Sequence, residues 1–102
     1  MKVRYTENAS AEISRIFEYI ARENPSAADA IVRRLENVLA KLVLFPHMGR
    51  TCDIPGVFVV PLGRYPYAVY YTIEDDELIV LHVHHGARLP PRFHEPSTAF
   101  RR

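Results

Sequence analysis

Hydrophobic positions follow a helical period over two stretches in the first half of the chain. The first stretch repeats apolar residues three and four positions apart, at Ile13, Ile16, Phe17 and Ile20. The second stretch does the same, at Ile31, Leu35, Val38, Leu39 and Leu42. This spacing puts the apolar side chains on one face of each helix. The pattern predicts two amphipathic helices joined by a few residues, a helix hairpin whose apolar faces need a partner surface.

Residues typical of helix ends set the expected bounds of this hairpin. Asn8 is the predicted N-cap of the first helix, since its side chain can accept a hydrogen bond from the first turn. We expect this helix to stop near Asn24, because Pro25 disfavours helical geometry in the residue before it. Residues 26–29 (SAAD) match the capping-box pattern, which predicts the start of the second helix there. The apolar stripe then runs to about Phe45.

Residues with high strand propensity dominate the second half of the chain. Val, Ile, Tyr and Phe are concentrated in three segments, at about residues 57–62, 67–73 and 78–84, as in strands. Sequential strands with short links pair antiparallel, and a short first strand is predicted over residues 3–6. The expected fold class is α+β in the order β-α-α-β-β-β, with the helix hairpin packed on one face of a small, mostly antiparallel sheet.

Alternation along the second of these three segments assigns its side chains to two faces of the sheet. Tyr67, Val69 and Tyr71 share one face, which we expect to be core. Tyr70 lies on the opposite face, beside Ala68. Because the helices cover only one side of the sheet, we expect the face of Tyr70 to be an open binding surface.

Composition and charge are those of one small globular domain. The chain has 102 residues, of which 48% are hydrophobic and 25% charged, with a net charge of +1. This charge is too small for a general nucleic-acid binder. No apolar run reaches the length of a membrane span and the single Cys52 forms no internal disulfide, so we expect a cytoplasmic protein. We expect a domain over residues 1–88 and a Pro- and Arg-rich tail over residues 89–102.

The histidines near the chain's last strand are the candidate metal ligands. His82 and His84 share one face of their strand, and His85 points to the other. A closed zinc site requires four ligands, and Cys52 and His47 would reach these histidines only if their loop folds over. We therefore predict no metal and no cofactor.

Four segments in a fixed order carry a family resemblance. They are residues 5–9 (YTENA), residues 44–50 (LFPHMGR), residues 67–71 (YAVYY) and residues 84–88 (HHGAR). Together they resemble motifs of the RelE/ParE superfamily, the toxins of bacterial type II toxin–antitoxin modules. The resemblance covers about residues 3–88.

The resemblance implies one of two activities. RelE-like members cleave messenger RNA in the ribosome with basic and aromatic residues on the sheet, whereas ParE-like members block DNA gyrase. This sequence departs from the nuclease pattern at three places. Ala68 replaces an arginine, residues 57–60 (VFVV) replace lysines, and His94 falls at or near the position of a tyrosine.

We therefore expect a ParE-like toxin, of the plasmid-stabilisation type, that inhibits gyrase by protein–protein contact and arrests growth. The resemblance also implies a ParD- or RelB-like antitoxin that neutralises the toxin and provides any contact with operator DNA. Residues expected to contact the target or the antitoxin are Arg50, Arg64, Tyr70, His85 and Arg88. Two alternatives remain open. One is a ribosome-dependent endoribonuclease with Arg88, Arg64, His85 and His94 in its site; the other is a non-toxic remnant of the fold.

Overall fold

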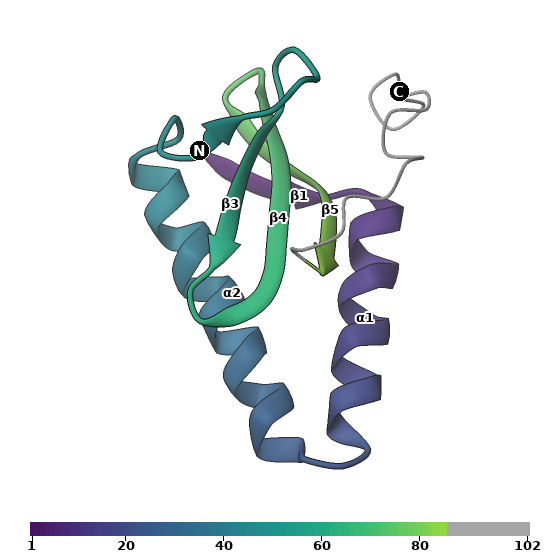
Figure 1. Ribbon diagram of the computed structural model, residues 1–102. Coiled ribbons are helices and arrows are strands. Elements are labelled where there is room, and N and C mark those ends of the chain that lie inside the picture. Colours follow the sequence, from purple (N-terminus) through teal and green to yellow (C-terminus); the bar gives the residue numbers. More distant parts are fainter. Residues whose placement is uncertain (86–102) are drawn as a thin grey trace.

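The computed structural model describes residues 1–85 of the chain. Two helices and five strands follow one another as β1, α1, α2, β2, β3, β4 and β5 (Figure 1). Their bounds are β1 Lys2–Tyr5, α1 Glu7–Ala21, α2 Pro25–Leu44, β2 Arg50–Thr51, β3 Phe58–Leu62, β4 Tyr65–Glu74 and β5 Glu77–His85. The predicted α+β class is confirmed. The expected tail, together with Arg88 and His94, lies outside the described residues.

The strands form one sheet in the order β1-β5-β4-β3-β2. β1 pairs with β5 in parallel, and every other neighbouring pair is antiparallel. The β4–β5 hairpin turns at Asp75 and Asp76, whose φ angles of 50° and 63° are both positive. A two-residue turn of this kind matches the right-handed twist of the strands that it joins. β2 was not predicted, since a strand of two residues leaves no alternating pattern.

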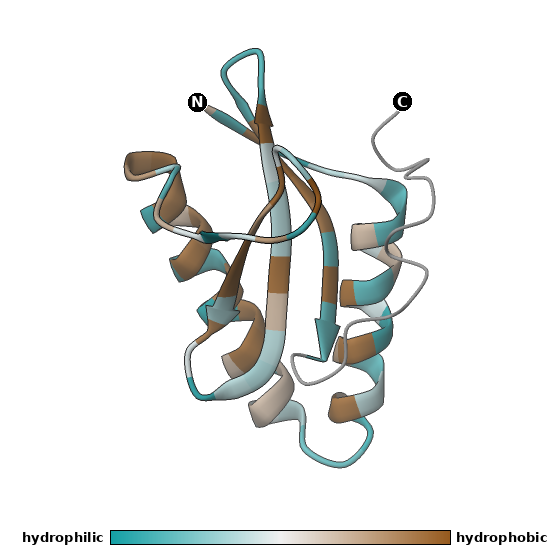
Figure 2. Cartoon of the chain, turned by 45° about the horizontal axis from the view of Figure 1, so that its top comes forward, coloured by the Kyte–Doolittle hydropathy of each residue, from teal (hydrophilic) through white to brown (hydrophobic). Residues whose placement is uncertain are grey.

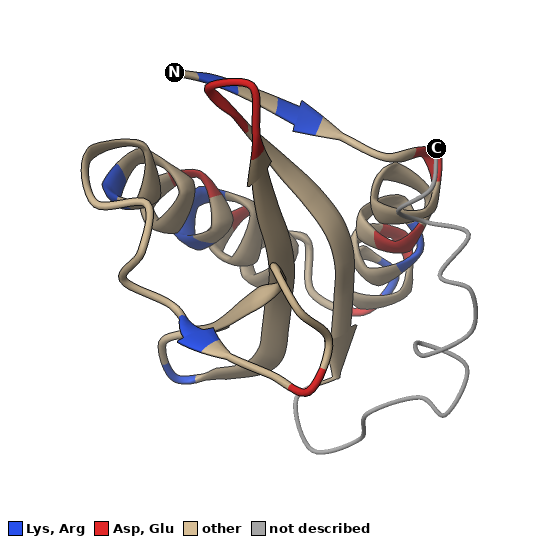
Figure 3. Cartoon of the chain, turned by 90° about the horizontal axis from the view of Figure 1, so that it is seen from above, with Lys and Arg blue, Asp and Glu red and all other residues tan. Residues whose placement is uncertain are grey.

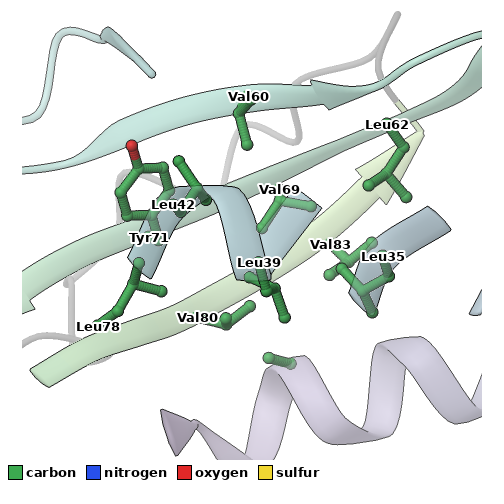
Figure 4. Packing of buried hydrophobic residues seen from close by; sticks show 11 residues of the cluster. Leu35, Leu39, Leu42, Val60, Leu62, Val69, Tyr71, Leu78, Val80 and Val83 are labelled. Carbon is green, nitrogen blue, oxygen red and sulfur yellow. The ribbon is translucent and has the colours of Figure 1, made fainter. Parts of the chain in front are cut away.

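Both helices pack against the same face of the sheet (Figure 1). Leucines of α2 meet apolar side chains of three strands there (Figure 4), namely Leu35, Leu39 and Leu42 with Val60, Leu62, Val69, Tyr71, Leu78, Val80 and Val83. The predicted assignment of Val69 and Tyr71 to the core face is confirmed, and Tyr67 packs at its margin. Within the described part of the chain, neither helix has both the length and the apolar character needed to cross a membrane.

The N-caps of both helices differ from the prediction. Thr6, and not Asn8, caps α1, because β1 leads directly into the helix and the Thr6 hydroxyl accepts an N–H of the first turn at 3.0 Å. Asn24, and not Ser26, caps α2 through its side-chain oxygen at 3.1 Å. Pro25 then occupies the first helical position, where its missing N–H costs no hydrogen bond.

Tyr71 ties the segment after α2 to the middle of the sheet. Its hydroxyl donates to the carbonyl of Pro46 at 2.8 Å and accepts from the N–H of Gly49 at 3.1 Å. A Cβ at Gly49 would lie 2.7 Å from the same oxygen, so the close approach requires glycine. Burial raises the pKa of Tyr71, and the hydrogen bond from Gly49 lowers it in part. The hydroxyl therefore stays neutral and holds this segment against β4.

Tyr71→Phe should lower the free energy of unfolding by about 1–3 kcal/mol, because the N–H of Gly49 and the carbonyl of Pro46 lose their hydrogen-bond partner at a partly buried position. Urea denaturation of the full chain measures this loss. Tyr19→Phe is the matched control: Tyr19 is 71% exposed on α1, and its change should stay within about 0.5 kcal/mol. Equal destabilisation by both substitutions would contradict this role for Tyr71.

Candidate functional site

A bulge in β5 decides which way its histidines face. Leu81 and His82 stand opposite the single Tyr70 of β4. Such a bulge shifts the alternation of side chains along the strand by one position. His82 and His84 therefore share the face of the sheet away from the core helices, where their partners across the sheet are Tyr70 and Ala68. The prediction that the two histidines share a face is confirmed.

Glu12 of α1 provides a hydrogen-bond acceptor at one edge of β5. β1 pairs only with the first half of β5, so no strand within residues 1–85 borders the second half on that side. The Oε1 atom of Glu12 accepts a hydrogen bond from the N–H of Val83 at 2.9 Å. Its Oε2 atom lies 3.1 Å from Nδ1 of His82 and 3.7 Å from Nε2 of His84. One carboxylate thus satisfies a backbone donor and also faces two imidazoles.

These three residues form a compact group that we call the Glu12–His82–His84 cluster. Their side chains are only 14–19% exposed, and the two imidazole rings stack with centroids 4.9 Å apart. Burial lowers the pKa of His84, the negative charge of Glu12 acts in the opposite direction, and His82 lowers it further. Three potential metal-ligating atoms, one from each residue, lie within 4.8 Å of one another.

Sequence reasoning found the two histidines but missed their partner. Glu12 is 70 residues away from His82 along the chain. A usable signal was nevertheless present, since Glu12 stands three residues after Ala9 and four residues before Ile16, on the same helix face. A carboxylate within an apolar stripe faces the packed side of its helix and needs a polar partner there.

The second face of the sheet is less open than expected. Figure 2 shows the β2–β3 loop crossing in front of the strands, and its residues Cys52 and Ile54 pack on an apolar cluster. The cluster consists of Val57, Ala68, Tyr70, Ile79 and Leu81. Tyr70 is only 6% exposed, so the expectation that it lies on an open surface is wrong. Leaving these apolar side chains in water would cost free energy, and the loop reduces that cost.

The structure brings two of the predicted contact residues to one end of the sheet. Arg64 is exposed in the turn between β3 and β4, with its guanidinium carbon 5.8 Å from the centre of the Tyr65 ring. His85 is exposed at the end of β5, and its ring lies 5.9 Å from that of Tyr67. Arg50 is exposed on the edge strand β2, beside the start of β3. It is therefore separated from Arg64 by the length of β3.

Positive charge is scarce on the last three strands. Residues 57–85 contain Arg64 and no other arginine or lysine, and in Figure 3 the blue positions lie mostly on the helices, β1 and β2. Ala68, which replaces the arginine of the nuclease pattern, is a buried member of the apolar cluster that the β2–β3 loop covers. Val57 and Val60 are buried as well. Within the described strands, the positions of the nuclease pattern are thus occupied by packing residues.

Solved structures with the same fold include two toxin–antitoxin systems. The structure of the chromosomal ParDE system from P. aeruginosa matches with a TM-score of 0.73 and 23% identity, over 83% of this chain and 95% of that chain. The intact RelBE complex from E. coli matches with a TM-score of 0.63 and 18% identity, over 85% and 98%. At these identities the likeness establishes the fold, that of the RelE/ParE toxins.

Sequence comparison then identifies the family. The family model of the ParE toxin of type II toxin–antitoxin systems, parDE, matches residues 3–90. Toxin RelE2 of Caulobacter vibrioides is 31% identical over 90 residues, which cover 86% of this chain and 98% of that toxin. The chain belongs to the ParE/RelE family of toxins from type II toxin–antitoxin systems.

Replacing Glu12 should weaken the attachment of α1 to β5. Glu12→Ala removes the acceptor of the Val83 N–H, and we expect a loss of about 1–3 kcal/mol in the free energy of unfolding, measured by urea denaturation. Glu18→Ala removes an exposed carboxylate from the same helix and should change stability by at most about 0.5 kcal/mol. An equally small effect at Glu12 would show that the carboxylate does not hold the helix in place.

Proposed function

We propose that this toxin inhibits DNA gyrase by protein–protein contact and does not cut RNA. The observation that carries the proposal is the apolar packing at the positions where a nuclease needs cations. Cleaving RNA through its 2′-hydroxyl requires a base, an acid for the leaving group and fixed positive charge on the phosphate. The buried side chain of Ala68 offers no such charge, and Val57 and Val60 are also buried. An inhibitor that acts by contact needs none of these groups.

Exposed apolar and basic side chains offer a surface for the target. Leu44 and Phe45, where α2 ends, are 72% and 63% exposed. Aromatic side chains and arginine are enriched in the central contacts of protein interfaces. We assign gyrase contacts to this helix end and Arg50, and to the rim formed by Arg64 and His85. Arg88, outside the described residues, completes the set as a prediction.

The partner that neutralises the toxin is proposed to be a cognate antitoxin. The structures with the same fold from P. aeruginosa and E. coli are both toxin–antitoxin systems. In this chain an apolar crevice runs between the two helices, lined by Ile13, Ile16, Phe17, Ile20, Ile31 and Leu35 among others. The crevice is narrow, so an amphipathic antitoxin helix would lay its apolar face over its mouth, where Phe17 is 37% exposed, and gain affinity after paying for its ordering. Since the β2–β3 loop covers part of the second sheet face, we assign the antitoxin to the helix hairpin.

A supercoiling assay with purified gyrase tests the proposed target. The full-length toxin should block supercoiling, and Arg64→Ala should raise the concentration needed about tenfold, the effect of losing one interface contact worth about 1.4 kcal/mol. Arg33→Ala is the control, since Arg33 is exposed on α2 and its loss changes the net charge by the same amount. Arg33→Ala should inhibit like the unchanged toxin.

Translating ribosomes provide the opposing test. The proposal would be overturned in favour of the nuclease if the toxin cuts messenger RNA at fixed codon positions and leaves gyrase active. Arg88→Ala should then abolish the cuts. Induced expression of soluble protein without growth arrest would overturn it in favour of a non-toxic remnant. Growth arrest relieved by co-expression of the antitoxin is the result that we expect.

A further inference from the structure

We propose that Glu12, His82 and His84 bind one divalent transition-metal ion of the zinc type. The inference rests on the geometry of this cluster and does not depend on which target the toxin inhibits. The proposed metal site joins α1 to β5, since Glu12 and His82 are 70 residues apart in the sequence.

The spacing of the ligand atoms fits a tetrahedral ion. Zinc–ligand bonds of about 2.0–2.1 Å in a tetrahedron place neighbouring ligand atoms about 3.3 Å apart. The Oε2 atom of Glu12 lies 3.1 Å from Nδ1 of His82 and 3.7 Å from Nε2 of His84. All three atoms fall within 4.8 Å of one another. The two separations from Oε2 lie on both sides of the tetrahedral value, so the carboxylate is placed for one ion, and the imidazole rings must turn for all three atoms to reach it.

The donor set has the chemistry that zinc prefers. Two imidazole nitrogens and one carboxylate oxygen are ordinary zinc ligands, and a site with three protein ligands leaves a fourth position for water. With neutral imidazoles the cluster carries one negative charge, which lowers the cost of placing a dication in a largely buried site.

The backbone of β5 already orients the carboxylate. The Oε1 atom of Glu12 is held by the Val83 N–H at 2.9 Å, which leaves Oε2 directed at the histidines. Hydrogen bonds of this kind to a ligating carboxylate are a regular feature of metal sites and strengthen the binding. The imidazole rings stack at an angle of 19° between their planes, so each must turn about its χ2 torsion to ligate. That torsion is broad for histidine, and the turn has to displace the edge contact between the rings of His84 and Tyr70, whose centroids lie 5.9 Å apart.

A thermal unfolding titration tests the site. The full-length chain without a histidine tag, stripped of metal and freed of chelator, is titrated with Zn²⁺ and with Co²⁺. At a hundredfold excess over Kd, Zn²⁺ should raise Tm by roughly 10 °C. Co²⁺ should bind one ion per chain and give the visible absorption of a four-coordinate site. His82→Ala and His84→Ala should each abolish both signals.

Two further variants keep the proposal falsifiable if an alanine variant fails to fold. Glu12→Gln still offers an oxygen to the Val83 N–H but removes the charged ligand, and its affinity should fall at least about tenfold. His85→Ala is the matched control, since His85 is exposed on the same strand, and it should bind like the unchanged chain. The proposal is overturned if neither ion raises Tm. A rise that persists in Glu12→Gln and in the variants of His82 and His84 would equally reject it, because the ion would then bind elsewhere.

Discussion

β5 must find hydrogen-bond partners along both of its edges while most of its side chains are buried, and the rest of the structure depends on how it does so. β4 occupies one edge throughout. On the other edge, β1 pairs with the first half only. Thr6 follows at the bulge, where its N–H donates to the carbonyl of Val80 and its hydroxyl to that of Leu81, each at 3.0 Å. Glu12 then accepts the Val83 N–H. Without these partners each buried polar group would cost about 1–3 kcal/mol.

The hydrogen bonds at this edge of β5 hold α1 beside the sheet. The position of α1 in turn determines which side chains remain exposed for a partner. Thr6 caps α1 while it binds the bulge, so the start of the helix and the edge of β5 form one unit. The helices fill one face of the sheet, and the β2–β3 loop covers part of the other. Among the described residues, the exposed groups at which we expect target contacts are the end of α2, the edge strand with Arg50, and the rim with Arg64 and His85. Such a distribution suits recognition of a protein better than chemistry on a phosphate.

Most of the fold follows from patterns within single segments of the sequence. The apolar period predicts both helices, and alternation assigns Val69 and Tyr71 to the core face. These local patterns do not predict contacts between segments that are distant in the sequence. Thr6 caps α1 instead of Asn8 because its position is set by the pairing of β1 with β5. Tyr70 is covered by a loop whose path no local pattern reveals.

In the candidate site, too, the local pattern was predictable and the contact between distant segments was not. Spacing along one strand placed His82 and His84 on a common face, although the bulge changes which face that is. Their neighbour Glu12 comes from a helix 70 residues earlier. Its position within the apolar stripe of α1 is a local signal of a buried polar partner, but it does not say which partner. Only the folded chain brings the carboxylate to the histidines.

We propose that this toxin acts by occupying its target and not by turnover. Titrating a fixed amount of gyrase with the purified toxin separates the two modes of action most directly. We expect residual supercoiling to fall in proportion to the ratio of toxin to gyrase and to reach its minimum near stoichiometric amounts. Full gyrase activity at a large excess of toxin, with many messenger RNA molecules cut per toxin molecule on translating ribosomes, would contradict it.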